Sequence, residues 1–165
     1  MARTHARTKG KSGSSRPVTP NLSFVTMKAK DVMTKNVGFC HEDDNLGKAV
    51  AVMWQKDCGM IPVVGEKDRL IGVVTDRDIS VAATTRNLNP SDIPVKDLII
   101  GKTITCSRKD SIKKILKKMQ KHQINRLPVV KKNGQLDGVI SINDLLQMKK
   151  SKKFRKQIFK TLKAI

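Results

Sequence analysis

The chain has 165 residues, of which 38% are hydrophobic, and a formal net charge of +20. This length suits one ordinary domain with a buried core, which excludes wholesale disorder even at this charge. No run approaches the roughly 18 apolar residues of a membrane-spanning helix, and the first 20 residues lack the apolar stretch of a secretory signal. We therefore expect a soluble, cytoplasmic protein without a membrane span.

The positive charge is distributed unevenly along the chain. Residues 1–26 carry five basic residues and no acid, and this composition predicts a basic flexible tail. Residues 27–95 hold nine bases and ten acids, whereas residues 96–148 hold twelve bases and four acids. The last segment, 149–165, has eight bases and no acid. The excess charge therefore lies in the second half of the body and in both ends.

Two helices are predicted near Leu46 and Ile112, where apolar residues recur at helical spacing. Each is followed by a β-rich run, at 60–64 or 126–130, then by a polar turn and a second β-rich run. In the second turn Asn133-Gly134 favours a tight hairpin, because both residues tolerate the positive φ angles of a primed turn.

Thr75 and Ser141 stand directly after the second β-rich runs, and each can cap a further helix. The unit is therefore strand, helix, strand, strand, helix, and neither copy alone covers its sheet. Two copies packed sheet against sheet would form one domain of two halves.

The two units align at an offset of 66 residues without a gap. Twelve of the 49 positions from 31 to 79 are identical to their partners, which indicates two copies of one supersecondary unit. The identical pairs are Asp31 with Asp97, Cys40 with Cys106, Asp44 with Asp110, Lys48 with Lys114, Met53 with Met119, Pro62-Val63-Val64 with Pro128-Val129-Val130, Leu70 with Leu136, Gly72-Val73 with Gly138-Val139, and Asp78 with Asp144.

Five segments carry a family resemblance: KAKDVMTKNV at 28–37, MIPVV at 60–64, GVVTDRDI at 72–79, NRLPVV at 125–130 and GVISINDL at 138–145. They resemble the cystathionine-β-synthase (CBS) domain, and the tandem pair is similar to a Bateman module. The motifs occur twice in register across about 120 residues, which makes the resemblance specific.

The resemblance implies an α/β (α+β) fold in which two tandem β-α-β-β-α repeats pack sheet to sheet with pseudo-two-fold symmetry. In this interpretation repeat 1 covers residues 27–85, a linker covers 86–94 and repeat 2 covers 95–148. A basic amphipathic helix at 149–165 follows. CBS pairs commonly associate as two modules in a flat disk, so the resemblance also implies a homodimer.

The residues that begin the second helices suit a nucleotide. A hydroxyl at Thr75 or Ser141 would lie at a helix N-terminus, where free N–H groups and the helix dipole favour a phosphate. Asp78 and Asp144 follow one turn later, and a carboxylate there can accept both hydroxyls of a ribose. The same four residues also fit plain helix capping with no ligand.

The CBS resemblance implies that an adenosine nucleotide (AMP, ADP or ATP) is the regulatory ligand, and no required cofactor. It assigns the aspartates to the ribose, the hydroxyls to ribose or phosphate, two arginines to phosphate, and the remaining positions to the base. The candidate ligand-binding residues are Asn36, Val37, Ile61, Pro62, Thr75, Arg77, Asp78, Thr103, Arg126, Leu127, Pro128, Ser141 and Asp144.

The two expected clefts are chemically unequal. In the second repeat the D-h-M-T pattern of the family becomes 97–100, DLII, which removes its Met and Thr. Met60 occupies the position that matches Arg126, and Asn143 the position that matches Arg77. One cleft is therefore expected to bind more tightly than the other.

The C-terminal segment places Phe154, Ile158, Leu162 and Ile165 on one stripe of a basic helix. Such a helix packs against its own domain or a dimer mate, or it contacts an anionic polymer or surface.

No catalytic chemistry is indicated by the sequence. Three cysteines without C-x-x-C spacing and three scattered histidines predict no metal site. There is no P-loop and no activated nucleophile, so a non-enzyme is expected.

Two hypotheses of function follow. The first is an adenosine-nucleotide-sensing regulatory protein, with a role in energy sensing, that modulates an unidentified partner as a homodimer. The alternative is a nucleic-acid-associated protein in which the CBS pair is a dimerisation scaffold and the basic ends contact phosphates.

Overall fold

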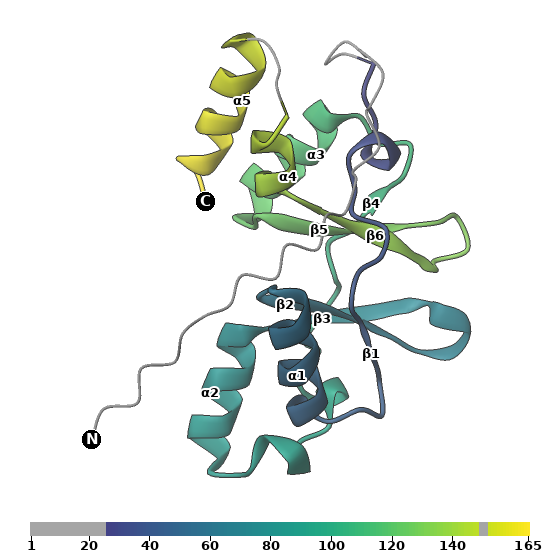
Figure 1. Ribbon diagram of the computed structural model, residues 1–165, viewed down its shortest axis with the longest axis vertical. Helices are drawn as coiled ribbons and strands as arrows, with labels where there is room; N and C mark the ends of the chain where they lie inside the picture. The colour runs from purple at the N-terminus through teal and green to yellow at the C-terminus, as the bar shows by residue number, and fades with distance from the viewer. Residues whose placement is uncertain (1–25, 149–151) are drawn as a thin grey trace, which may run out of the picture.

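A computed structural model describes residues 26–148 and 152–165, and it consists of two similar halves (Figure 1). Each half contains the predicted order strand, helix, strand, strand, helix. The first half holds β1 (Cys40–His41), α1 (Leu46–Lys56), β2 (Met60–Val64), β3 (Leu70–Thr75) and α2 (Asp76–Arg86). The second holds β4 (Cys106–Ser107), α3 (Ile112–His122), β5 (Arg126–Val130), β6 (Leu136–Ser141) and α4 (Ile142–Leu146), and α5 (Lys152–Leu162) follows.

The strand pairing repeats at the same offset as the sequence. In each half the first strand is parallel to the second, and the second is antiparallel to the third. Met60 pairs with Thr75, and Arg126 pairs with Ser141, 66 residues further on. The predicted mixed fold of two tandem repeats is therefore confirmed.

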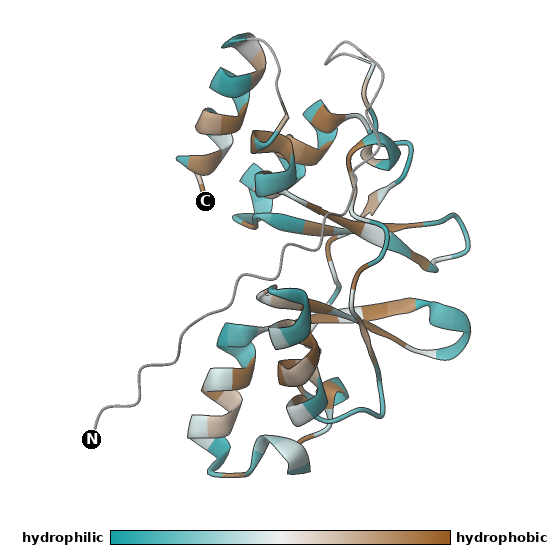
Figure 2. Ribbon diagram, viewed as in Figure 1, coloured by the Kyte–Doolittle hydropathy of each residue, from teal (hydrophilic) through white to brown (hydrophobic). Residues whose placement is uncertain are grey.

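The two sheets face each other at the centre of the molecule, and the helices lie on their outer sides (Figure 1). The strands at this centre are largely hydrophobic (Figure 2). The hairpin tips also meet, because the Leu70 N–H donates to the Gly134 carbonyl at 3.1 Å and the Gln135 side chain donates to the Lys67 carbonyl at 2.9 Å.

Each half lends a segment to the other. Met27, Ala29 and Met33 precede β1 in sequence but are buried in the core of the second half. In the opposite direction, Ile93 and Val95, from the segment between α2 and β4, are buried in the core of the first half. Because both segments cross over, the halves interlock as one folding unit.

One turn differs from the expectation. Gly134 has a positive φ of 84°, as predicted for the hairpin, but Asn133 does not. The Gly134 N–H donates to the Lys131 carbonyl, and the Asn133 side chain accepts from the N–H of Gln135. Only Gly134 therefore adopts the positive φ that the hairpin requires. Asn133 stabilises the turn through the hydrogen bond that its side chain accepts.

The C-terminal helix packs against the body of its own chain. Phe154 and Ile158 of α5 are buried with α3 and α4, as one of the two interpretations expected. Leu162 and Ile165 remain 36% and 41% exposed, so the predicted four-residue stripe was wrong in its second half. Thr161 takes the buried position instead, because it lies three residues after Ile158 on the inward face.

No helix among the described residues is long and apolar enough to cross a membrane. The predicted basic tail, 1–26, lies almost wholly outside the described residues.

Candidate functional site

Thr75 and Asp78 form a reciprocal cap at the start of α2. The Asp78 N–H donates to Oγ1 of Thr75, and both the Thr75 N–H and its hydroxyl donate to Oδ2 of Asp78. Ser141 and Asp144 repeat this arrangement at α4. Both pairs therefore act as helix caps. Oδ1 of Asp78 has no hydrogen-bond partner among the described residues, so it remains available to a ligand.

A cavity of about 620 Å³ lies between the two halves and brings several predicted residues together. Its volume is within the usual range for small-molecule sites. Six predicted residues line it: Thr75, Arg77, Asp78, Thr103, Arg126 and Pro128. The other lining residues are Gly59, Met60, Val73, Asp76, Leu98, Ile99, Ile100, Lys102, Ile104, Gln123, Ile124, Asn125 and Ile165. We call this cavity the interrepeat cleft.

The interrepeat cleft combines positive charge with an apolar wall. Arg77, Lys102 and Arg126 reach it from three different segments, and none forms an ion pair within the described part of the chain. Arg77 also lies in the first turn of α2, where free N–H groups favour an anion. Ile99 and Ile104, from the segment between α2 and β4, contribute apolar surface. The cleft can therefore hold a ligand with both a phosphate and an aromatic base.

Seven predicted residues do not line this cleft. Ile61 and Leu127 have no exposed side-chain surface, so they can offer a ligand only main-chain groups. The described structure does not bring the remaining five into the interrepeat cleft. They are Asn36, Val37, Pro62, Ser141 and Asp144.

The sequence did not predict the apolar wall that Ile99, Ile100 and Ile104 give the cleft. Ile99 and Ile100 follow the residue that matches the family aspartate, and Ile100 is 93% exposed at the cavity. Gln123 and Asn125 were also missed; Gln123 ends α3 in a left-handed conformation. The run of three apolar residues at 98–100 was the available signal, since Leu98 and Ile99 pack partly on the core of the first half and Ile100 is left exposed.

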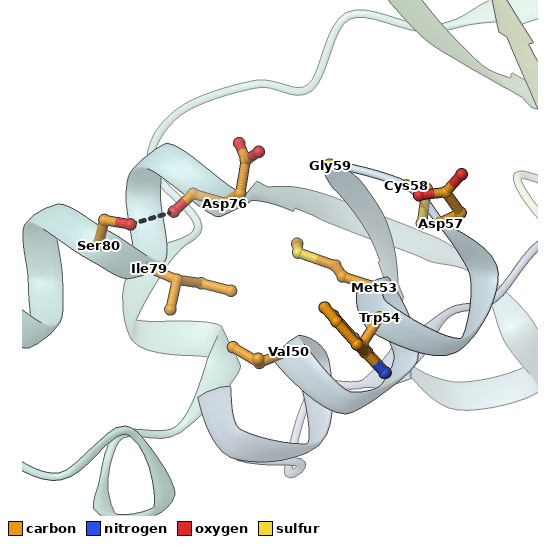
Figure 3. Close-up of a pocket in the computed structure, with 9 residues that line it drawn as sticks. All are labelled: Val50, Met53, Trp54, Asp57, Cys58, Gly59, Asp76, Ile79 and Ser80. Atoms are coloured by element: carbon orange, nitrogen blue, oxygen red, sulfur yellow. Dashed lines mark hydrogen bonds between the residues drawn. The ribbon is translucent and has the colours of Figure 1, made fainter. Parts of the chain in front are cut away.

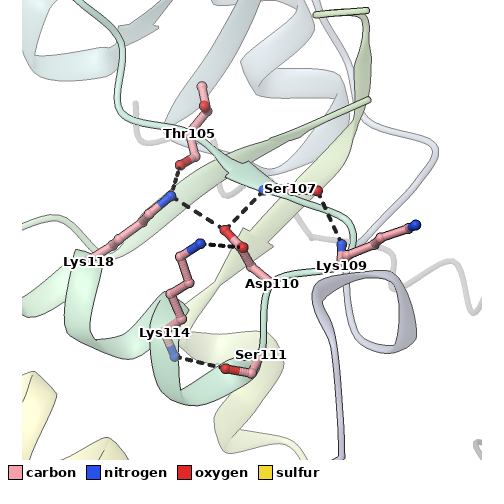
Figure 4. A network of polar contacts seen from close by, with 7 residues as sticks. All are labelled: Thr105, Ser107, Lys109, Asp110, Ser111, Lys114 and Lys118. Carbon is pink, nitrogen blue, oxygen red and sulfur yellow. Dashed lines mark hydrogen bonds and ion pairs between the residues drawn. The ribbon is translucent and has the colours of Figure 1, made fainter. Parts of the chain in front are cut away.

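A polar network holds the segment that leads from the cleft into β4 (Figure 4). Asp110 accepts from Lys114 at 2.8 Å and from the Ser107 N–H at 3.2 Å, and Lys118 lies 3.4 Å away. Lys118 also donates to the Thr105 carbonyl at 2.7 Å. Because Thr103 and Ile104 line the cleft, this network positions one of its walls.

The network perturbs two titrating groups. Burial raises the pKa of the Asp110 carboxyl, but the hydrogen bonds from Lys114 and Ser107 and the charge of Lys118 outweigh burial, so its pKa lies below the usual value. Burial, followed by the Asp110 charge, raises the pKa of the neighbouring Cys106 thiol to about 12. Burial likewise raises the pKa of the Cys40 thiol, at the equivalent position, to about 11.

No group of three or more His, Cys, Asp or Glu side chains that could hold a metal ion occurs within residues 26–148 and 152–165.

A family model described as "CBS domain" matches the chain twice, at residues 29–84 and 91–150. Protein YlbB of Bacillus subtilis is 34% identical over 119 residues, which are 72% of this chain and 79% of YlbB. Homoserine O-acetyltransferase of Methanococcus vannielii is 34% identical over 123 residues, but the matched region is only 25% of that enzyme. The chain is thus similar to a small part of the enzyme and to most of YlbB.

Solved structures share the fold. Hypoxic Response Protein I, crystallised with two coordinated zinc ions, has 30% identity and a TM-score of 0.68 over 73% of this chain and 98% of its own. A CBS domain protein of Pyrobaculum aerophilum in complex with AMP has 22% identity and a TM-score of 0.68 over 81% and 99%. The CBS pair of protein MJ0100, in complex with 5-methylthioadenosine and S-adenosyl-L-methionine, has 20% identity and a TM-score of 0.66 over 74% and 94%.

Proposed function

Because this chain belongs to the CBS domain family, we propose that it is a regulatory protein whose interrepeat cleft binds an adenosine ligand. The observation that carries the proposal is the convergence of Arg77, Lys102 and Arg126 on one cavity beside a free carboxylate oxygen of Asp78. A phosphate and a ribose need these two kinds of group. Two structural relatives in complex with AMP or with S-adenosyl-L-methionine support the adenosine class.

In the proposed complex the ligand spans both halves. The phosphate or another charged group lies near the start of α2, within reach of Arg77 and Arg126. The ribose hydroxyls donate to Oδ1 of Asp78, while Oδ2 keeps its role in the cap. The base lies against Ile99 and Ile104. Because the ligand touches both repeats, its binding would favour one relative placement of the two halves over others.

The cleft that binds is proposed to be the one at Asp78 and Arg126 rather than its pseudo-symmetric counterpart. At the counterpart position Met60 replaces Arg126 and Asn143 replaces Arg77, so two cations are absent. A phosphate there would lose two charge-assisted hydrogen bonds.

A thermal-shift screen with AMP, ADP, ATP and S-adenosyl-L-methionine tests the proposal. A ligand that binds the folded chain stabilises it by about 2.7 kcal/mol at 100 times the Kd. The melting temperature therefore rises as the ligand concentration increases. The Asp78→Ala chain should lose the shift. Asp144→Ala is the matched control, since it removes the same cap at α4 but leaves the interrepeat cleft intact. Equal loss in both variants would contradict the assignment.

The expected homodimer and the regulated partner remain predictions. Sedimentation of the chain with and without ligand measures the first, and a ligand-dependent change of the sedimentation coefficient would link it to regulation. We do not propose an enzymatic activity, because the titrating groups of the interrepeat cleft are at positions that suit ligand binding.

A second candidate function, nucleic-acid association, is favoured by one surface. α3 contains five lysines and no acid, and Lys113, Lys117 and Lys121 are exposed at i, i+4 and i+8. None of these three forms an ion pair with a described residue. Binding to a DNA duplex should then weaken steeply with salt, and Lys117→Glu with Lys121→Glu should reduce it. Salt-insensitive binding would contradict this candidate.

A further inference from the structure

The segment that follows α5 lines the interrepeat cleft. Ile165 contributes to the lining together with residues 123–126, where α3 ends and β5 begins. Ile165 lies outside both matches of the CBS family model, which end at residue 150. It is partly exposed, so some of its apolar surface is available to a molecule in the cleft. A residue from outside the two repeats therefore forms part of the candidate ligand site.

The repeat symmetry is broken after the second helix of each half begins. In the first half α2 continues without interruption to Arg86, and Figure 3 shows its first turns, where the Ser80 hydroxyl donates to the Asp76 carbonyl at 2.9 Å. In the second half α4 already ends at Leu146, the residue that matches Ser80. α5 begins at Lys152, which matches the last residue of α2. The residues after α4 therefore form a separate helix instead of extending the second one.

The separate helix packs back along the second half and runs toward its sheet (Figure 1). Phe154 and Ile158 are buried in the core with α3 and α4, and Thr161 is buried about one turn further along. An isolated helix of 11 residues is only marginally stable in water, so α5 depends on this packing. Ile124 connects the packing to the ligand site, since it packs against the same core and also lines the interrepeat cleft.

We propose that Ile165 is a further ligand-contacting residue of the interrepeat cleft, and that a bound adenosine ligand therefore stabilises the packing of α5. This inference rests on the proposed function and adds a ligand-responsive element to it. Ile165 adds apolar surface from the C-terminal segment, whereas Ile99 and Ile104 supply it from the segment between α2 and β4. A ligand that contacts Ile165 binds more tightly when α5 is packed. By linkage, the ligand stabilises the packed state by the same factor.

The charge of the C-terminal segment favours the same arrangement. Residues 149–165 hold eight bases and no acid, so their approach adds positive potential to a cleft whose own cations favour a phosphate. Lys160 lies in the last turn of α5, where a cation offsets the negative end of the helix dipole. The end of α5 can therefore lie beside an anionic ligand without repelling it.

Hydrogen exchange of the full chain, measured by mass spectrometry with and without AMP, tests the inference, and ATP and S-adenosyl-L-methionine serve as further probes. With a bound probe, the amides of α5 should exchange about three- to tenfold more slowly, together with those at the start of α2. Slower exchange at the start of α2 without a change in α5 would overturn this inference and leave the proposed function intact. Absence of calorimetric binding with every probe would overturn both.

Substitutions on α5 and after it locate the effect. Ile165→Ser should raise the Kd of the bound probe about three- to tenfold, because it removes part of the apolar contact, and it should abolish the slower exchange of α5. The variant keeps Phe154 and Ile158, so α5 should still pack. Leu162→Ser is the matched control, since Leu162 is similarly exposed but does not line the cleft, and its Kd should stay unchanged. A wild-type Kd in Ile165→Ser, or equal weakening in both variants, would overturn the proposal.

Discussion

The main chain of Thr34, in the first half, pairs with that of Val139 in β6 of the second half. Each N–H donates to the carbonyl of the other residue, at 2.9 and 3.0 Å. Gly138 permits this approach, because a Cβ at that position would overlap the Thr34 carbonyl. A Cβ at Gly72, its partner in the repeat, would overlap the side chain of Ile99. The repeated glycines are therefore explained by the two crossing segments, each packed on the opposite sheet.

Replacing Gly138 with alanine should destabilise the chain by about 1–3 kcal/mol, because the added methyl group meets main-chain atoms that cannot move aside. Gly72→Ala is the comparison, and it should cost less, since the added methyl group meets side-chain atoms of Ile99 and not main-chain atoms. Urea unfolding followed by circular dichroism measures both. A larger loss of stability in Gly72→Ala than in Gly138→Ala would contradict this, since it would show that the contact of Gly138 with Thr34 is less tight than that of Gly72 with Ile99.

Asp110→Asn should reduce stability at neutral pH by about 1–3 kcal/mol, because it removes a charged acceptor that Lys114, Lys118 and the Ser107 N–H share. The pKa of Asp110 is lower in the folded chain than its usual value. Its contribution is therefore present above the unfolded pKa, about 3.9, and is lost as the pH falls through the folded pKa.

Unfolding of the wild type and of Asp110→Asn at pH 7 and near pH 3 checks this prediction. The difference in stability should shrink at the lower pH. Asp44→Asn is the matched variant in the first half, where Val52 stands at the position of Lys118 and, among the described residues, only Lys48 forms an ion pair with the carboxylate. Its effect should be the smaller one. A difference between wild type and Asp110→Asn that does not change with pH would contradict the role of the charge.

One cysteine per chain should react rapidly with a thiol reagent at pH 8. Burial raises the pKa of Cys40 to about 11 and that of Cys106 to about 12, so each is a thiolate in less than about one molecule in a hundred at this pH. Cys58 is partly exposed and should react. In Cys58→Ser, rapid labelling should disappear until denaturant is added. Fast labelling of two or more thiols in the folded wild type would contradict the burial of Cys40 and Cys106.

The repeat made most of the fold predictable from the sequence. Residues 66 apart, such as Met60 and Arg126, occupy equivalent strand positions, because the same apolar pattern produces the same sheet twice. The crossing of the segments at Met27 and Ile93 was not predictable, since periodicity identifies an element but not the sheet on which it packs. The burial of Thr161 in place of Leu162 had the same cause: only the packing of α5 against α3 and α4 decides which residues face inward.

The candidate site was predictable in its polar part. Thr75, Asp78 and Arg126 stand within the motifs that the sequence shows, and in the structure all three line one cavity. The apolar wall at Ile99 and Ile100 departs from the family pattern, so only the structure assigned it to the cleft.

Calorimetric titration of the purified chain with AMP, ADP, ATP and S-adenosyl-L-methionine tests the central claim most directly. The account predicts saturable heat with at least one of these ligands, at a stoichiometry of about one per chain, since one of the two pseudo-symmetric clefts lacks its cations. Arg126→Ala should abolish this heat, whereas Asn143→Ala should preserve it. Absence of heat with every adenosine ligand, or binding that survives Arg126→Ala unchanged, would contradict the assignment of the interrepeat cleft.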